Sequence, residues 1–205
     1  MKHKASRDLY AYWNSLRGEH PAPERNQIDP GAIRTALGDT LILSQERGND
    51  AQFRLAGTRV CALFCRELKN TAFEPLFDDK SRREITDIVS QANADFTGVV
   101  AGLSANVADA PSVPVELLLL PIFQRGTTDG RLIGVLAPAA APYWLGVKPV
   151  QSLTLNSWRH VSPQLDAITV PKYFDLPEVP ATPAAGATAP AARQRAFVVF
   201  NGGRA

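Results

Sequence analysis

Apolar residues at helical spacing mark the beginning of the chain. The positions of Leu9, Trp13 and Leu16 place all three side chains on one side of a helix. We expect this helix over residues 6–17, because Gly18 can take the left-handed conformation that ends helices.

A second short helix is predicted after it. Asp29 is a favourable N-cap, and Pro30 suits the first helical position. Ile33 and Leu37 lie four residues apart, as on one face of a helix, and Gly38 ends the pattern. Both helices precede the first strand, so we expect them on the outside of a sheet.

The next segments alternate between strand and helix patterns. Residues 40–44 are apolar, residues 52–55 alternate, and residues 47–50 between them are turn formers, which predicts an antiparallel hairpin. The period then becomes helical. The residues that repeat at this helical spacing are Cys61, Phe64, Cys65 and Leu68.

The longest helix is predicted from Ser81 onwards. Ser81 and Glu84 have the spacing of a capping box, and an apolar stripe follows them. That stripe consists of Ile85, Ile88, Val89 and Ala92. Three further strands are expected over residues 99–107, 114–123 and 131–137, which makes the chain an α+β protein.

The regular pattern weakens after Ala137. Only residues 152–155 indicate another short strand, whereas residues 177–190 are rich in proline and alanine, as in semi-extended linkers. The apolar run 196–200 predicts a segment that docks as an extra strand or on a partner. We therefore divide the chain into a helical extension (1–38), a sheet domain (39–161), a Pro/Ala-rich linker (162–192) and a C-terminal apolar arm (193–205).

Composition narrows the classes of function. Hydrophobic residues make up 45% of the chain and charged residues 20%, enough to bury a core. The formal net charge is only +2 and the arginines are scattered, which argues against nucleic-acid binding. Two cysteines and three distant histidines do not suit a structural zinc site or a metal enzyme.

The chain shows no pattern typical of membrane insertion or secretion. The most apolar stretch, residues 132–147, is interrupted by Pro138 and Pro142 and is shorter than a spanning helix. Residues 1–9 are basic and polar, unlike a secretory signal. We expect a cytoplasmic protein, in which both cysteines stay reduced.

Several stretches resemble a known family. They are Phe53-Arg54-Leu55-Ala56-Gly57-Thr58, Cys61-Ala62-Leu63-Phe64-Cys65-Arg66-Glu67-Leu68, Tyr12-Trp13-Asn14-Ser15-Leu16-Arg17-Gly18, Asp29-Pro30, Glu116-Leu117-Leu118-Leu119-Leu120-Pro121 and Arg131-Leu132-Ile133-Gly134. With the order of elements, they make residues 9–161 similar to a bacterial PAS subfamily, formerly catalogued as a domain of unknown function. Residues 199–203 show a weaker likeness. The resemblance implies a PAS fold: a five-stranded antiparallel sheet with helices on one face.

One departure from that subfamily concerns Cys65. Relatives tend to have glycine before the Arg-Glu-Leu run, and here a cysteine side chain is added. We expect this side chain to fill space near the end of the helix and to change the shape of a pocket there.

The resemblance implies a non-enzymatic signalling protein. PAS domains bind a small ligand in the core or pair with other proteins, and the fold does not decide between the two. The chain shows no kinase, cyclase or DNA-binding segment, so we expect a stand-alone sensor or adaptor that acts through a regulatory partner. A ligand-independent interaction or dimerisation scaffold is the alternative.

No cofactor or catalytic group is predicted. No histidine lies between His20 and His160 to serve as a haem ligand, and the context of Cys65 is not that of flavin photosensors of this fold. Cys61 and Cys65 suit small core side chains better than a redox pair. Asp78 and Asp79 precede a helix, where carboxylates favour its positive end.

Two further groups of residues contain side chains that serve functional sites in other proteins. Gly102-Leu103-Ser104 lacks the second glycine and the partners of a nucleophilic serine. Arginine guanidinium groups match phosphate oxygens, which would suit a nucleotide second messenger, although a solvated surface is the better explanation of these arginines. The arginines concerned are Arg82, Arg83, Arg193, Arg195 and Arg204.

The pocket of a PAS sensor is expected between the sheet and the helices. Its candidate lining residues, which would equally fill a solid core, are Phe53, Leu55, Cys61, Phe64, Cys65, Ile85, Ile88, Val89, Leu118 and Leu120. The N-terminal helix suits packing on its own sheet or burial against a second copy, and we expect a homodimer. The partner or dimer contact candidates are Leu9, Trp13, Leu16, Phe197 and Val199.

Overall fold

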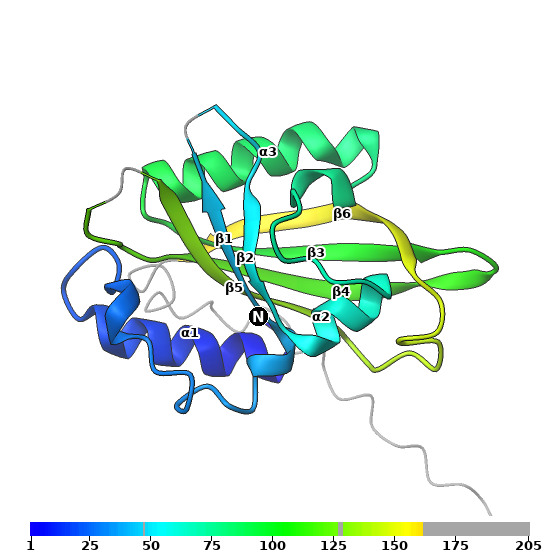
Figure 1. The fold of residues 1–205 in the computed structure, drawn as a ribbon, viewed down its shortest axis with the longest axis horizontal. Helices are drawn as coiled ribbons and strands as arrows, with labels where there is room; N and C mark the ends of the chain where they lie inside the picture. The colour runs from blue at the N-terminus through cyan, green and yellow to red at the C-terminus, as the bar shows by residue number, and fades with distance from the viewer. Residues whose placement is uncertain (47, 127–128, 162–205) are drawn as a thin grey trace, which may run out of the picture. The chain divides into compact units, whose positions relative to one another are not determined.

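A single antiparallel sheet organises the protein. The computed structural model describes residues 1–46, 48–126 and 129–161. The strands follow the spatial order β2-β1-β5-β4-β3-β6 (Figure 1). Their bounds are Thr40–Gln45 (β1), Gln52–Ala56 (β2), Gly98–Val107 (β3), Ala110–Pro121 (β4), Gly130–Pro138 (β5) and Val150–Val161 (β6). The predicted hairpin and the three later strands are confirmed, each within a few residues.

The sheet has six strands among the described residues, where five were expected. Strand β6 is much longer than the predicted segment 152–155, and it pairs with β3 along its whole length. Many of its side chains are polar and only partly buried, so its sequence carries a weak strand signal. Its strand conformation depends instead on hydrogen bonds to β3, which lies far away in the sequence.

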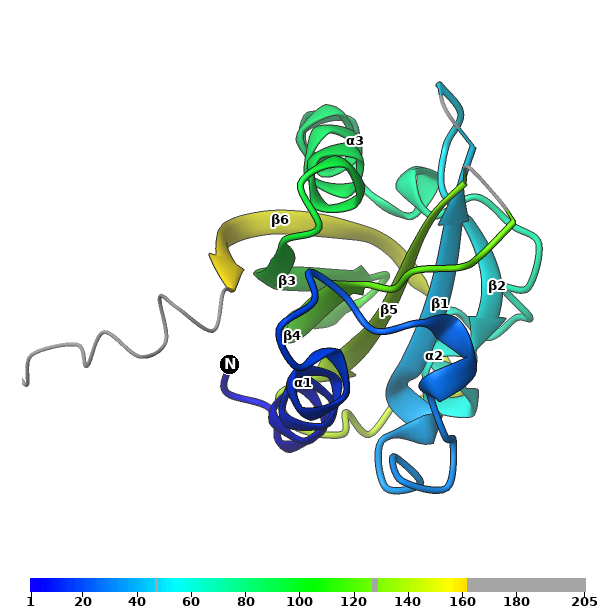
Figure 2. The same cartoon turned by 90° about the vertical axis from the view of Figure 1, so that its left-hand side faces the viewer.

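Three α-helices lie on the two faces of this sheet. They are α1 (Lys4–Arg17), α2 (Thr58–Phe64) and α3 (Asp79–Ala94). Short 3₁₀ turns are added at Arg25–Gln27, Leu37–Asp39 and Glu74–Leu76. Figure 2 shows α3 and α1 on opposite sides of the sheet, so the helices do not all cover one face.

The sheet separates two apolar cores. Side chains of α2 and α3 pack with Leu41, Phe53 and Leu117 in the larger core, whereas those of α1 pack with Ile42 and Leu118 in the smaller one. Neighbouring residues of a strand point to opposite faces, which is why Leu117 and Leu118 belong to different cores. The large central strands therefore carry apolar residues on both faces.

Helix α1 uses its apolar face within its own chain. Leu9 and Trp13 are 0% and 3% exposed, and Leu16 packs against the same smaller core. The Trp13 Nε1 atom donates a hydrogen bond to the Pro121 carbonyl oxygen at 2.7 Å. The expectation that these three residues contact a second copy is thus wrong for Leu9 and Trp13, because the sheet already buries them. The other two contact candidates, Phe197 and Val199, lie outside the described residues, as do the predicted linker and arm.

The second predicted helix is a series of turns instead. Ala32, Ile33 and Ala36 each donate a backbone hydrogen bond to the carbonyl three residues earlier. Three-residue spacing puts Ile33 and Ala36 on the buried side and leaves Leu37 37% exposed. Asp29 caps the first turn, since its Oδ1 accepts from the Gly31 amide at 2.8 Å.

Helix α2 ends earlier than its pattern predicts. Cys65 has φ 49° and ψ 32°, a left-handed conformation that glycine adopts most readily. The Cys65 side chain is exposed. The expectation that Cys65 fills space in a pocket is therefore wrong, because its position at the helix end directs it to solvent.

Helix α3 begins at Asp79, two residues before the predicted start, and is fastened to β6. Asp78 caps it: the Asp78 Oδ1 accepts from the Ser81 amide at 2.8 Å, and Oδ2 accepts from the Thr154 hydroxyl at 2.5 Å. The hydrogen bond from Thr154 is the main cause that lowers the pKa of Asp78. Trp158 of β6 donates to the Glu84 Oε1 at 2.7 Å. The predicted capping role of the acidic residues is confirmed for Asp78.

Candidate functional site

The expected pocket between the sheet and helices α2 and α3 is filled by side chains. Phe53, Phe73 and Phe77 are at most 1% exposed and pack edge to face, with ring centroids 5.6 and 5.2 Å apart. The predicted lining residues Phe64, Ile85, Ile88 and Val89 belong to this core, and Cys61 packs against it. The packing gives these residues a structural role and leaves their role in ligand binding a proposal.

Four other predicted lining residues lie elsewhere. Leu118 and Leu120 point into the smaller core beneath α1, because strand alternation turns Leu117 and Leu119 toward α3 instead. Leu55 is 40% exposed, and Cys65 is at the surface. The ten candidates therefore do not line one pocket.

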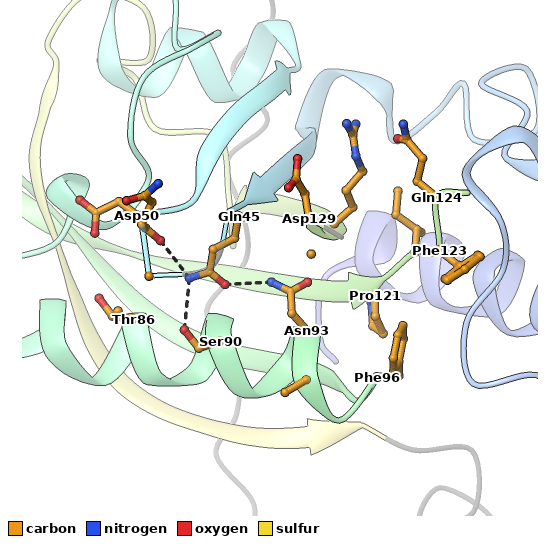
Figure 3. A pocket seen from close by; sticks show the side chains of 16 residues that line it. Gln45, Asp50, Thr86, Ser90, Asn93, Phe96, Pro121, Phe123, Gln124 and Asp129 are labelled. Carbon is orange, nitrogen blue, oxygen red and sulfur yellow. Dashed lines mark hydrogen bonds between the residues drawn. The ribbon is translucent and has the colours of Figure 1, made fainter. Parts of the chain in front are cut away.

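A surface cleft lies beside this core, at one end of α3 (Figure 3). Its volume is about 600 Å³, within the range of small-molecule sites. The walls come from the β1–β2 connection, the C-terminal half of α3, the residues after β4 and the beginning of β5. We call it the α3 cleft.

A chain of amide side chains crosses the α3 cleft. The Gln45 Nε2 donates to the Ser90 hydroxyl at 3.2 Å, and the Asn93 Nδ2 donates to the Gln45 Oε1 at 3.0 Å (Figure 3). The Asn93 Oδ1 is buried and accepts no hydrogen bond from the described residues. Such an acceptor costs stability unless another group satisfies it.

Gly130 makes room for Asn93 at the beginning of β5. A Cβ at position 130 would stand 2.5 Å from the Asn93 Cγ, closer than real contacts allow. The position of Asn93 therefore depends on the missing side chain at Gly130.

Arg131 places a positive charge in the wall of the α3 cleft. Its Nε is buried and donates no hydrogen bond within the described part of the chain. Burial lowers the pKa of the Arg131 guanidinium, and the charges of Arg54 and Arg25 lower it further, whereas Asp129 raises it. Arg131 thus stands among like charges in a partly desolvated position, which favours an anion as its neighbour.

A second cleft of about 500 Å³ meets the α3 cleft at this arginine. Both clefts are lined by Arg131, Phe123 and Gln124, and the second adds Arg25 and Arg125. Arg125 is engaged by Glu24, with an N–O distance of 2.6 Å. We call this second space the arginine cleft.

Exposed phenyl rings form the apolar part of the α3 cleft. Phe96 and Phe123 are 40% and 45% exposed, and Pro121 lies with them along one wall (Figure 3). Phe96 has φ 50°, and the Thr97 amide donates to the Ala92 carbonyl, the pattern of a Schellman helix end. Glycine is the usual residue at this left-handed position, so Phe96 adds backbone strain to the end of the helix.

The residues of the α3 cleft were not found from the sequence. Arg131 was named only because it belongs to a stretch that resembles a known family. Gln45, Asn93 and Phe96 belong to no recognised sequence motif. Asn93 and Phe96 come after the apolar stripe of α3. The change of residue type at the end of that stripe is the signal that the sequence offers for them. Four separate segments build the cleft, so local spacing could not reveal it.

Other kinds of site find no support in the described residues. Within residues 1–46, 48–126 and 129–161, no group of three or more His, Cys, Asp and Glu residues could hold a metal ion. No helix in that part of the chain is long and apolar enough to cross a membrane.

Comparison with known proteins agrees with the fold. The PAS_5 family, described as a PAS domain, matches residues 1–137, which includes α1 and the sheet up to β5. No curated protein matches the chain. Because the family match covers well over half of the chain, the protein belongs to the PAS domain family.

Proposed function

We propose that this protein is a non-enzymatic PAS sensor that binds a small ligand in the α3 cleft and relays that event to a regulatory partner. PAS domains are sensory modules, and the packed core leaves the surface cleft as the better site. The observation that carries the proposal is the pair of buried polar atoms without partners, the Asn93 Oδ1 and the Arg131 Nε, at one cleft. A ligand that satisfies both would remove their desolvation cost.

The route of the signal follows from the contacts of α3. In the cleft, Gln45 at the end of β1 is hydrogen-bonded to Ser90 and Asn93 near the C-terminal end of α3. Asp78, at the other end, and Glu84 hold β6 through Thr154 and Trp158. A ligand that binds at Gln45 and Asn93 would change how firmly α3 is held to β1 relative to β6. A partner bound to β6 would respond to that change.

The cytoplasm is the proposed location. Cys61 and Cys65 are both free thiols, as expected in a reducing compartment. The likeness to a bacterial subfamily extends this proposal to a bacterial cytoplasm.

The first test is to identify what the purified protein carries. Mass spectrometry of molecules released on denaturation, followed by thermal-shift titration of each compound, should find a ligand that raises the melting temperature with concentration. Asn93→Ala should reduce the shift, whereas Tyr143→Ala, which changes an exposed ring outside both clefts, should leave it nearly unchanged. A ligand whose shift survives Asn93→Ala would place binding outside the α3 cleft.

The filled core and the position of β6 at the edge of the sheet favour a second candidate, a ligand-independent interaction or dimerisation scaffold. The outer edge of β6 is hydrogen-bonded at Leu153 to the Asp78 amide and at Leu155 to the Ser81 hydroxyl, so the rest of this edge is the part that a partner would use. Strand β6 pairs with β3 on one side and with no described strand on the other. Such an edge can add a strand from another chain. Capture of one partner in equal yield with and without ligand, or a homodimer in sedimentation experiments, would favour this candidate.

A further inference from the structure

We propose that the ligand of the α3 cleft is a planar ring that carries an anionic group, with the ring against Phe96 and the anion at Arg131. This inference rests on the proposed function and names the chemical class of its ligand. It combines three features of the cleft: a guanidinium without an ion pair among the described residues, although the charge of Asp129 acts on it, two exposed phenyl rings and an amide oxygen without a partner there.

The anionic group follows from the state of the neighbouring arginines. Arg125 is paired with Glu24, and the Arg54 Nε donates to the Ser44 hydroxyl at 2.9 Å. Arg131 forms no ion pair among the described residues, although it lies where the α3 cleft and the arginine cleft meet. A carboxylate or phosphate at this junction would gain charge-assisted hydrogen bonds and would offset the repulsion from Arg25 and Arg54.

The planar ring follows from Phe96. Phe96 is 40% exposed at a left-handed helix end, where glycine would avoid the backbone strain, and part of its ring remains in contact with water. A flat ring stacked on Phe96 would remove apolar surface of both partners from water. Phe123 lines the same space and adjoins the arginine cleft, so it connects the ring position to the anion position.

The polar edge of the ring follows from Asn93. Its Oδ1 is an unused acceptor, and its Nδ2 is already engaged by Gln45. A ring N–H or amino group can donate to this oxygen. Nucleotides and nitrogen-containing aromatic acids share all three features, so both sources belong in the test.

The test titrates the full-length protein with four probes by isothermal calorimetry. Adenosine 5′-monophosphate and indole-3-acetate each carry a ring and an anion, whereas adenosine lacks the anion and inorganic phosphate lacks the ring. We expect one of the first two to bind at least about 10-fold more tightly than adenosine and phosphate. Preference for the monophosphate identifies the nucleotide source, and preference for indole-3-acetate identifies the carboxylate source.

Matched variants locate the binding. Arg131→Gln should weaken the preferred probe about 10-fold or more, and Phe96→Gly about 10-fold, although the latter relieves backbone strain and should not unfold the protein. Arg83→Gln and Tyr143→Ala change an exposed arginine and an exposed ring outside both clefts, and should leave affinity unchanged. Arg131→Lys, which keeps the charge but loses the guanidinium fork, should bind with intermediate affinity.

Three results would overturn the inference. They are no binding of either charged ring probe, equal binding of adenosine and its monophosphate, and unchanged affinity in Phe96→Gly and Arg131→Gln. An uncharged molecule recovered from the purified protein, with binding that depends on Asn93, would refute the anionic ring class while the proposed sensor function still holds.

Discussion

The core beneath α2 and α3 differs from the α3 cleft beside it in how completely its side chains are packed or hydrogen-bonded. In the core, three phenyl rings pack edge to face and nearly every side chain is apolar and buried. In the cleft, amides and a guanidinium are held beside exposed phenyl rings, and two buried polar atoms lack partners. The core therefore contributes mainly to stability, whereas the cleft contains polar atoms without hydrogen-bond partners among the described residues. This difference is the reason why we propose the α3 cleft, and not the core, as the ligand site.

The largest effect is expected in the core. Phe73→Ala removes the central ring of the three and should lower the free energy of unfolding by about 3–5 kcal/mol. Phe123→Ala, in the cleft, removes a ring of the same size that is 45% exposed and should cost less than about 1 kcal/mol. Urea denaturation measures both changes. Similar costs at the two sites would remove the contrast between the regions.

A smaller effect is expected where the beginning of β5 meets α3 in the cleft. Gly130→Ala places a Cβ against Asn93 and should destabilise the protein by about 1–3 kcal/mol. Because the clash is with this side chain, Asn93→Ala in the same molecule should recover most of the loss. A double-mutant cycle from urea denaturation gives the coupling. Additive effects would show that Asn93 does not occupy the space beside Gly130.

Glu74 is a polar exception within the region of the core, and it should show a pH-dependent effect. Burial is the main cause that raises the pKa of Glu74, and only its Oε1 accepts a hydrogen bond, from the Ala51 amide. A carboxyl group with a raised folded-state pKa favours folding below its ordinary pKa, and this contribution is lost as pH rises through the raised value.

Glu74→Gln removes that charge and keeps an acceptor for Ala51. The variant should be more stable than the natural protein by about 1 kcal/mol at neutral pH, with the difference vanishing in acid. Thermal unfolding of both proteins from pH 4 to pH 8 measures the difference directly. A gap between the two proteins that is constant with pH would exclude titration of Glu74 as its cause.

The smallest effect is expected at the strained end of α3. Phe96→Gly should raise the free energy of unfolding by about 0.5 kcal/mol, because we expect the strain relieved at φ 50° to exceed the burial lost with a side chain that is 40% exposed. Phe96→Ala, which keeps the Cβ, should not give this gain. Chemical denaturation of the two variants makes the comparison. A loss of stability in Phe96→Gly would mean that the ring contributes to folding.

Parts of the fold that depend on local pattern were predictable. The apolar stripe of α3, the alternation of β2 and the turn between β1 and β2 are short-range signals, and the resemblance to PAS domains placed them in order. Strand β6 was predicted only over residues 152–155, and the turns after Asp29 were predicted as a helix, because long-range pairing and three-residue turns override local spacing. The face of Leu118 was also misjudged, since a strand buried on both faces shows no alternation.

The sequence by itself determined the fold family, the α+β order of elements and the capping role of Asp78, because each depends on residues close together in the chain. Only the tertiary structure decided that the core is filled, that α1 covers the opposite face of the sheet, and that Gln45, Asn93, Phe96 and Arg131 meet in one cleft. These residues belong to three different elements and one connection. Their meeting depends on the register of β1 against β5 and on the docking of α3, which arise from packing and hydrogen bonding across the whole sheet.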